Sequence, residues 1–385
     1  MKSTQNQKIS QIKFSTLVVG LDVAKETHYA RAFDLRGMEL SKLLRFSNTA
    51  EGYQKLEEWT QEICRQRQKT DIIVGFEPTG HYWFTLGDHL KSHGHRLAIV
   101  NPFHVKRSKE LDDNSPSKSD SKDPKTIAML VKDGRYREVY IPEGLYQEMR
   151  VVVAERDRLV QRLITINNNV SRWIDIHFPE YPTVFKDWRG QAGFLTLRHF
   201  PTPEKIASAG AEKIEAIWKR YMRRTAGLKR AQQLVEAAQS SIGRKTGLVA
   251  AEAGLQNLLT EYELYRQQYA DLEQLMLDLL QQVPNGEKLL AIKGVGLVTA
   301  ATFVGEVGDI SRFQDPRQIQ KLAGLNLVEN SSGKHQGKTR ISHRGRKRLR
   351  HGLFMAMITI LAKNQEFRML HQKNLILGQY GYHGH

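Results

Sequence analysis

The sequence predicts an α/β domain with a mixed sheet, followed by all-α segments through the rest of the chain. Three observations lead to this fold class. Short apolar runs alternate with helical spacing in the first part, an apolar period of about 3.5 residues follows in two long segments, and helical patterns flank a glycine turn in the last part. The chain has 385 residues, enough for two or three domains. No apolar run approaches the ~18 residues that cross a bilayer.

Three strands are predicted first, because apolar runs with β-branched residues are separated by turn residues at 36–37: Thr16–Val23, Thr27–Leu35 and Glu39–Phe46. They are followed by a helix, a strand, a helix and a strand: Glu51–Gln68, Asp71–Phe76, Tyr82–His93 and Arg96–Val100. Short connections make the first three strands an antiparallel meander. The order βββαβαβ is that of RNase H-like domains, in which the first strand lies beside the fourth.

Two acidic residues stand where a nuclease needs them. Asp22 lies in the first apolar strand, where a carboxylate is costly unless it is paired or bound to a metal ion. Glu77 stands at the end of the predicted strand Asp71–Phe76. With the first and fourth strands adjacent, both carboxylates should project at one edge of the sheet. The alternatives are an Asp22 paired with Lys25 and a Glu77 that is merely a turn residue before Pro78.

Two further acids, Asp120 and Asp123, close a polar segment, Asp112–Asp123, that is predicted to be a loop. Their i,i+3 spacing would let one helical turn present both. Four carboxylates can hold two Mg²⁺ ions for phosphodiester cleavage. Asp123 is also a candidate N-cap with Pro124 at the first helical position, and Pro124 disfavours a continuous helix through both acids.

Two long helices with a coiled-coil period are predicted in the middle of the chain. Their apolar positions step by 3 and 4 from Leu145 to Trp173 and again from Leu258 to Val283. An insert, Phe178–Gly254, separates them. We expect an antiparallel hairpin or a dimerising arm, with ordinary amphipathic core helices as the alternative. In each case these helices are interpreted as scaffold.

A Gly-Val-Gly turn between two helical patterns, over Leu290–Gly308, resembles a helix-hairpin-helix element. Gly294 and Gly296 would let the backbone approach a phosphate, and the next helix offers free N–H groups there. Such contacts position DNA without reading its sequence. A plain tight turn between packed helices is the alternative.

A strongly basic segment follows, with eight Lys and Arg and no acid from Lys334 to Arg350. This density predicts contacts with phosphates. The residues are Lys334, Lys338, Arg340, Arg344, Arg346, Lys347, Arg348 and Arg350. A serine beside such cations has the chemistry to attack a phosphodiester, although Ser331 and Ser332 are also ordinary loop residues.

The composition supports a nucleic-acid partner. The chain carries 58 Lys and Arg against 41 Asp and Glu, a formal net charge of +17, and its pI is about 9.8. The single cysteine, Cys64, excludes an intrachain disulfide and a cysteine-based zinc site. The polar start has no signal-peptide pattern. We expect no membrane association and a cytoplasmic, prokaryotic, nucleoid-associated protein.

Three N-terminal segments resemble the DEDD signature of transposases from insertion sequences of the IS one-ten family: Gly20–Lys25, Gly75–Gly80 and Lys118–Asp123. Three C-terminal segments are similar to the second transposase domain of that family: Lys293–Gly296, Ala323–Lys334 and Ile341–Gly345. The six segments match in order over nearly the whole chain, which makes the resemblance specific. One departure is Pro124, where the family more often has alanine.

The resemblance implies a RuvC-like domain in which Asp22, Glu77, Asp120 and Asp123 bind Mg²⁺, with two ions expected and Mn²⁺ as a substitute. It implies a serine that joins covalently to DNA, which by motif position is Ser332, with Ser331 as the second choice. It also implies donor and target DNA, a structured non-coding bridge RNA, and a homo-oligomer, dimer or tetramer.

The expected activity is metal-dependent cutting and rejoining of DNA by a transposase or site-specific recombinase. A stand-alone nuclease of the Holliday-junction type is the alternative, and a nucleic-acid-binding protein with an inactive nuclease fold is a second one. The expected domains are a disordered start (1–14), a nuclease domain (15–140), a helical scaffold with an insert (145–283), a C-terminal transposase domain (284–370) and a tail (371–385), disordered from Leu375.

Overall fold

The computed structural model describes residues 4–113, 122–224, 227–328, 331–332, 335–336 and 339–380. The chain divides into two compact units, Met1–Ile141 and Pro142–His385. Within the described ranges, no helix combines the length and the apolar character needed to cross a membrane.

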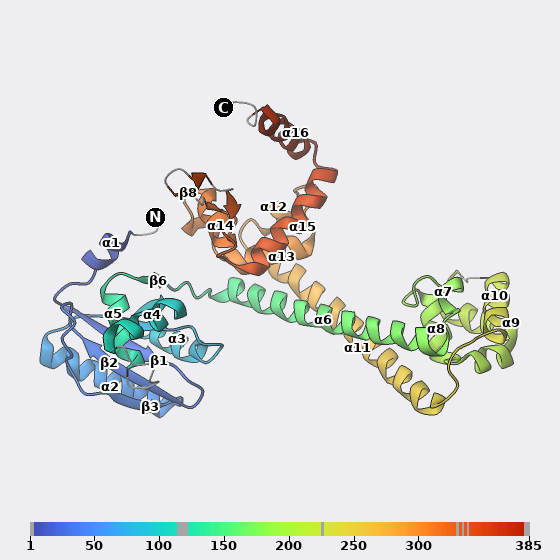
Figure 1. The fold of residues 1–385 in the computed structure, drawn as a ribbon, viewed down its shortest axis with the longest axis horizontal. Coiled ribbons are helices and arrows are strands. Elements are labelled where there is room, and N and C mark those ends of the chain that lie inside the picture. Colours follow the sequence, from blue (N-terminus) through green and yellow to red (C-terminus); the bar gives the residue numbers. More distant parts are fainter. Residues whose placement is uncertain are drawn as a thin grey trace. The chain divides into compact units, whose positions relative to one another are not determined.

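The first unit is built on a six-stranded mixed sheet with the order β3-β2-β1-β4-β5-β6. The sheet and its helices are drawn in blue to teal in Figure 1. The strands are β1 (Thr16–Asp22), β2 (Thr27–Phe33), β3 (Leu44–Ser47), β4 (Asp71–Phe76), β5 (Arg96–Val100) and β6 (Tyr136–Glu138). The first three form the predicted antiparallel meander, and β1 lies parallel to β4, as predicted. This arrangement is consistent with an RNase H-like domain. The short antiparallel strand β6 was not predicted.

Helices cover both faces of this sheet. They are α2 (Ala50–Arg67), α3 (Trp83–Ser92), α4 (Pro102–Asp113) and α5 (Asp123–Lys132), whereas α1 (Gln5–Ser10) precedes the sheet and buries no residue. Because side chains alternate along a strand, β1 sends Leu17, Val19 and Leu21 into a core with α2 and α3, and Val18 into a second core with α4 and α5. The sheet is therefore buried on both sides.

The predicted disorder over residues 1–14 is wrong for the described part of this segment, which contains α1. A capping box begins the helix: Thr4 Oγ1 accepts from the Gln7 N–H and Gln7 Oε1 accepts from the Thr4 N–H. Gln5 Nε2 then donates to the Asp133 carbonyl at 2.8 Å. Local capping and this tertiary contact order a segment whose polar composition suggested disorder.

The second unit is organised by two long helices that lie side by side, α6 (Gly144–His177) and α11 (Leu248–Gln282) (Figure 1). They run antiparallel, because one core joins the end of α6 to the start of α11 and another joins the start of α6 to the end of α11. A polar contact lies in the seam, where Arg156 Nη2 donates to the Tyr269 hydroxyl at 2.6 Å. Such a layer favours one register of the pair.

The residues between these helices form a compact helical lobe, the insert lobe. Its helices are α7 (Tyr181–Val184), α8 (Gln191–His199), α9 (Pro203–Tyr221) and α10 (Leu228–Gln239). Fully buried aromatic side chains fill its core, among them Phe178, Tyr181 and Trp218. The lobe is therefore a folded body with its own apolar core.

The C-terminal lobe contains α12 (Gly286–Leu290), α13 (Leu297–Val307), the 3₁₀ turn η1 (Ile310–Arg312), α14 (Pro316–Ala323), α15 (Lys347–Lys363) and α16 (Gln365–Tyr380). Four short strands interrupt it: β7 (Leu327–Val328), β8 (Ser331–Ser332), β9 (His335–Gln336) and β10 (Arg340–Ile341). The all-α prediction is thus wrong for these described strands, whose two-residue length carries too little pattern to be recognised. The predicted disorder from Leu375 is wrong as far as Tyr380, where α16 ends.

Candidate nuclease edge and C-terminal ribbon

Asp22 and Glu77 lie at the same edge of the sheet. The parallel register of β1 and β4 pairs Leu21 with Phe76, so the two acids are the next residues on neighbouring strands. Leu21 and Phe76 both enter the core under α2 and α3. By alternation, Asp22 and Glu77 belong to the opposite face, the one that α5 covers. Both acids are half-buried.

Two glycines bring α5 unusually close to this edge. A Cβ built on Gly20 would lie 1.9 Å from the Pro124 carbonyl oxygen, and one on Gly75 would lie 2.4 Å from a Val131 methyl group. Only residues without a side chain permit this approach. Because α5 begins at Asp123, the close packing places the start of the helix over β1, beside Asp22.

Asp123 is half-buried and is the first residue of α5, whereas the N-cap is Lys122, which makes no side-chain capping bond. The alternative of Asp123 as an N-cap is therefore wrong by one residue. Asp120 lies outside the described residues. Three half-buried carboxylates from β1, the end of β4 and the start of α5 offer the hard oxygen donors that Mg²⁺ takes. These residues fit a divalent metal.

A groove of about 420 Å³ lies beside Pro78, the residue that follows Glu77. It is lined by Pro78, Asn101 and His104 together with residues of β6. Two of the lining residues, Arg135 and Arg137, are exposed cations. Sequence reasoning missed them because Arg137 lies on the strand that was not predicted and Arg135 directly precedes it.

Ser331 and Ser332 form β8, which pairs antiparallel with β9 in the register Ser332 to His335. Strands β7 and β10 pair in the same way, with Leu327 opposite Ile341. The two pairs are nested in sequence, and we call the segment Leu327–Ile341 the ribbon. The predicted serine motif therefore lies on one strand of an antiparallel pair in the second unit. The side chains of both serines, as well as Lys334 and Lys338, lie outside the described part.

At the base of the ribbon, the segment around Gly324 crosses the segment around Gly345. A Cβ on Gly345 would lie 2.3 Å from the Gly324 nitrogen, so only glycine fits there. Hydrogen bonds then hold the crossing: Ser342 Oγ donates to Asn326 Oδ1 at 2.8 Å, and the His343 N–H donates to the Gly324 carbonyl at 3.0 Å. The two segments thus form one structural element that supports the ribbon.

The basic segment divides into two groups. Arg346 and Arg348 form ion pairs with Glu306 at 3.1 and 3.2 Å, and Glu306 is only 6% exposed. Arg350 donates to the carbonyl of Ala323 at 2.9 Å. These three arginines stabilise the lobe, a role that charge density alone did not indicate. Arg340, Arg344 and Lys347 are exposed, and their contact with phosphates stays a prediction.

The two glycines of the Gly-Val-Gly turn differ in the space around their Cα atoms. A Cβ on Gly294 would lie 2.7 Å from the Ile360 Cα, and Thr359 Oγ1 donates to the Gly294 carbonyl at 2.6 Å. Gly294 therefore serves close packing against α15, as the tight-turn alternative predicts. Gly296 is exposed with open space at its Cβ position and precedes α13, whose first N–H groups have no side-chain cap.

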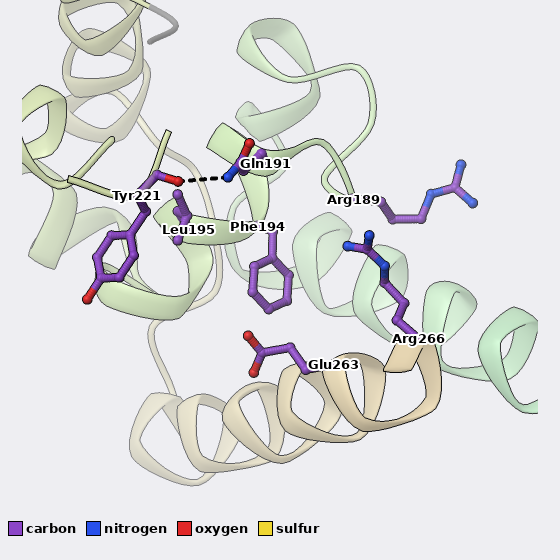
Figure 2. A pocket seen from close by; sticks show the side chains of 7 residues that line it. All are labelled: Arg189, Gln191, Phe194, Leu195, Tyr221, Glu263 and Arg266. Carbon is purple, nitrogen blue, oxygen red and sulfur yellow. Dashed lines mark hydrogen bonds between the residues drawn. The ribbon is translucent and has the colours of Figure 1, made fainter. Parts of the chain in front are cut away.

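A second concave surface, of about 520 Å³, lies in the second unit between the insert lobe and α11 (Figure 2). Two arginines and two aromatic rings share its lining, and Gln191 Nε2 donates to the Tyr221 carbonyl across it at 2.9 Å. The lining residues are Arg189, Gln191, Phe194, Leu195, Tyr221, Glu263 and Arg266. The scaffold interpretation did not single out this surface.

Both the N-terminal and the C-terminal parts of the chain are similar to known proteins. Residues 19–179 match the family model DEDD_Tnp_IS110, described as a transposase, and residues 286–372 match the model described as "Transposase IS116/IS110/IS902 family". The "Mini-circle putative transposase for IS117" of Streptomyces coelicolor is 25% identical over 331 residues, which are 83% of this chain and 78% of the relative. The "Insertion element IS116 uncharacterized 44.8 kDa protein" of Streptomyces clavuligerus is 22% identical over 346 residues, which are 90% and 84%.

These matches make the protein a transposase, an enzyme that acts on DNA. More narrowly, the chain belongs to the IS110 family, the IS one-ten family whose motifs it carries. The first matched segment contains the sheet edge with Asp22, Glu77 and Asp123, and the second contains the ribbon.

Proposed function

We propose that this transposase excises and inserts its own element by cutting and rejoining DNA, with Asp22, Glu77, Asp120 and Asp123 as the metal-binding carboxylates. The observation that carries the proposal is the convergence of three of these acids, from separate elements, at one sheet edge. Mg²⁺ bound there would activate the attacking oxygen and stabilise the leaving one. Arg135 and Arg137, in the adjoining groove, would hold the phosphates of the strand being cut.

The rejoining half of the reaction is assigned to Ser332, with Ser331 as the second choice. In the first step the serine Oγ loses its proton and forms a bond to the scissile phosphorus, while the bond to a deoxyribose oxygen breaks and that oxygen takes up a proton. The reverse step with a new deoxyribose hydroxyl rejoins the strand. The bond energy is kept in the covalent intermediate. Arg340, Arg344 and Lys347 would neutralise charge near the ribbon.

The test is a denaturation-resistant protein–DNA adduct, formed with DNA carrying the ends of the element. Wild-type protein should form it, Ser332→Ala should not, and Ser331→Ala should form it at close to the wild-type level. If Ser332→Ala recombines normally, Ser332 is not the nucleophile. A protein that cleaves junctions but never forms an adduct is instead the stand-alone nuclease.

The proposed partners are donor and target DNA, a bridge RNA and further copies of the chain. A formal charge of +17 supports polyanionic partners. The surface in Figure 2 supports a nucleic-acid contact in the insert lobe, since Arg266 would attract phosphate and the rings of Phe194 and Tyr221 in the same lining would stack on bases. The other lining arginine, Arg189, is paired with Asp187. Sequencing the RNA that copurifies with the protein tests the guide. A match to DNA flanking the gene is expected, and random cellular RNA would contradict it.

A further inference from the structure

A cluster of metal-ligating side chains lies on the helical face of the first unit, apart from the carboxylates of the nuclease edge. Glu57 projects from α2, His89 from α3, and His93 caps α3. One ligand atom from each lies within 4.8 Å of the others. His89 and His93 are spaced i,i+4, which places two imidazoles on one face of a helix, as in zinc-binding helices.

Two buried polar atoms of this cluster, Glu57 Oε1 and His89 Nε2, face each other at 3.3 Å. Among the described residues, neither atom makes a hydrogen bond of normal geometry with any other group. Two ligands at about 2.0–2.1 Å from a tetrahedral Zn²⁺ are about 3.3–3.4 Å apart. The pair therefore already has the separation of two ligands on one ion, and a shared cation would satisfy two atoms whose burial is otherwise costly.

Neighbouring groups orient these ligands. His95 Nε2 lies 2.8 Å from Glu57 Oε2, the oxygen that faces away from His89. His93 Nδ1 lies 2.8 Å from the His89 carbonyl, and a donating Nδ1–H leaves the His93 Nε2 lone pair available. Carboxylate and carbonyl partners of this kind fix ligands around protein-bound zinc.

We propose that Glu57, His89 and His93 bind a transition-metal ion of the zinc class, with water at the fourth position and His95 as a positioning residue. Two nitrogen donors and one oxygen favour Zn²⁺ over Mg²⁺, which takes oxygen ligands. The site joins α2 to α3 and so braces the helical layer over the sheet.

The site is distinct from the proposed Mg²⁺ centre. Helix α2 begins beside the β1–β2 turn, where Asn48 Nδ2 donates to the Lys25 carbonyl at 3.0 Å, and it runs away from that edge. His95 precedes β5, at the amino end of the parallel strands, whereas Asp22 and Glu77 stand at their carboxyl ends. The two sites therefore lie toward opposite ends of the sheet.

The experiment measures Zn²⁺ binding to the full-length protein by calorimetry after EDTA treatment, with Co²⁺ absorption as a second readout. His93 is exposed, so His93→Ala should fold normally. It should weaken Zn²⁺ binding at this site at least about 100-fold and abolish the tetrahedral Co²⁺ spectrum, and His95→Ala should weaken binding about 10- to 100-fold. His371→Ala, which removes an exposed histidine of α16, is the matched control.

The result expected is one Zn²⁺ per chain that His93→Ala and Glu57→Gln lose, while His371→Ala and Asp22→Asn keep it. Zn²⁺ should also raise the thermal midpoint of the wild type and not that of His93→Ala. Equal Zn²⁺ affinity in wild type and His93→Ala, or loss of the ion in Asp22→Asn, overturns the proposal.

Discussion

Gly20→Ala should separate the start of α5 from the sheet edge. The added Cβ would lie 1.9 Å from the Pro124 carbonyl oxygen. Carbon–oxygen contacts settle at about 3.3 Å, so the helix must retreat by about 1.4 Å. Backbone atoms on both sides leave no flexible group to yield. Overpacking of this kind lowers the free energy of unfolding by about 1–3 kcal/mol.

The same retreat carries Asp123 away from Asp22 and Glu77. A displacement of about 1 Å at a catalytic group costs about 10²-fold in rate. We therefore expect Gly20→Ala to remain folded, to melt at a lower temperature, and to cleave DNA about 100-fold more slowly at saturating Mg²⁺.

The assay is Mg²⁺-dependent strand cleavage, run beside thermal denaturation. Gly254→Ala is the control, because a Cβ there meets no described atom within 4 Å and alanine favours the helix by up to about 1 kcal/mol. That variant should cleave at the wild-type rate and be at least as stable. Wild-type cleavage and melting in Gly20→Ala would refute the role of close packing in placing Asp123.

Further variants test the division of the basic segment and the buried groups. Glu306→Ala leaves Arg346 and Arg348 without their shared carboxylate and should lower the free energy of unfolding by about 2 kcal/mol. This is less than the ~3–5 kcal/mol of a fully buried pair, because both arginines are partly exposed. Glu261→Ala, which removes an exposed acid of α11, should change the free energy of unfolding little. Arg344→Ala should weaken DNA binding and reduce the slope of log K against log salt concentration by about 0.9, without changing the melting temperature. Arg350→Ala loses its hydrogen bond to the Ala323 carbonyl and should lower the melting temperature. The reverse pattern would show that the two groups of cations are wrongly assigned. Burial lowers the pKa of His28, although a contact with Asn48 opposes this effect, so unfolding takes up a proton below pH ~6.5. The free energy of unfolding should therefore decrease as the pH is lowered, by up to about 1.4 kcal/mol per pH unit. His28→Gln should flatten this slope in denaturant titrations, and an unchanged slope would exclude His28 as its source.

The sheet and its acids could be predicted because they depend on local patterns. Apolar β-branched runs define β1 and β4, and the parallel neighbours follow from element order, which puts Asp22 and Glu77 together. The position of Asp123 depends on a tertiary approach at Gly20 that no periodicity encodes.

Other features depend on partners distant in sequence. Charge density could not separate Arg344 from Arg346, because the acid that pairs with Arg346 is 40 residues away. The ribbon has strands of two residues, too short for an alternation. The helix α1 did carry a local signal, Thr4 followed by Gln7, which a search for capping boxes would have found.

The most direct measurement is DNA cleavage as a function of Mg²⁺ concentration in carboxylate variants of the nuclease edge. Asp22→Asn, Glu77→Gln and Asp123→Asn should each reduce the cleavage rate at least about 10³-fold while DNA binding persists. Asp133→Asn, at the other end of α5, should cleave like the wild type. Full cleavage by Asp22→Asn, or equal loss in Asp133→Asn and Asp123→Asn, would contradict a metal-dependent centre at this edge.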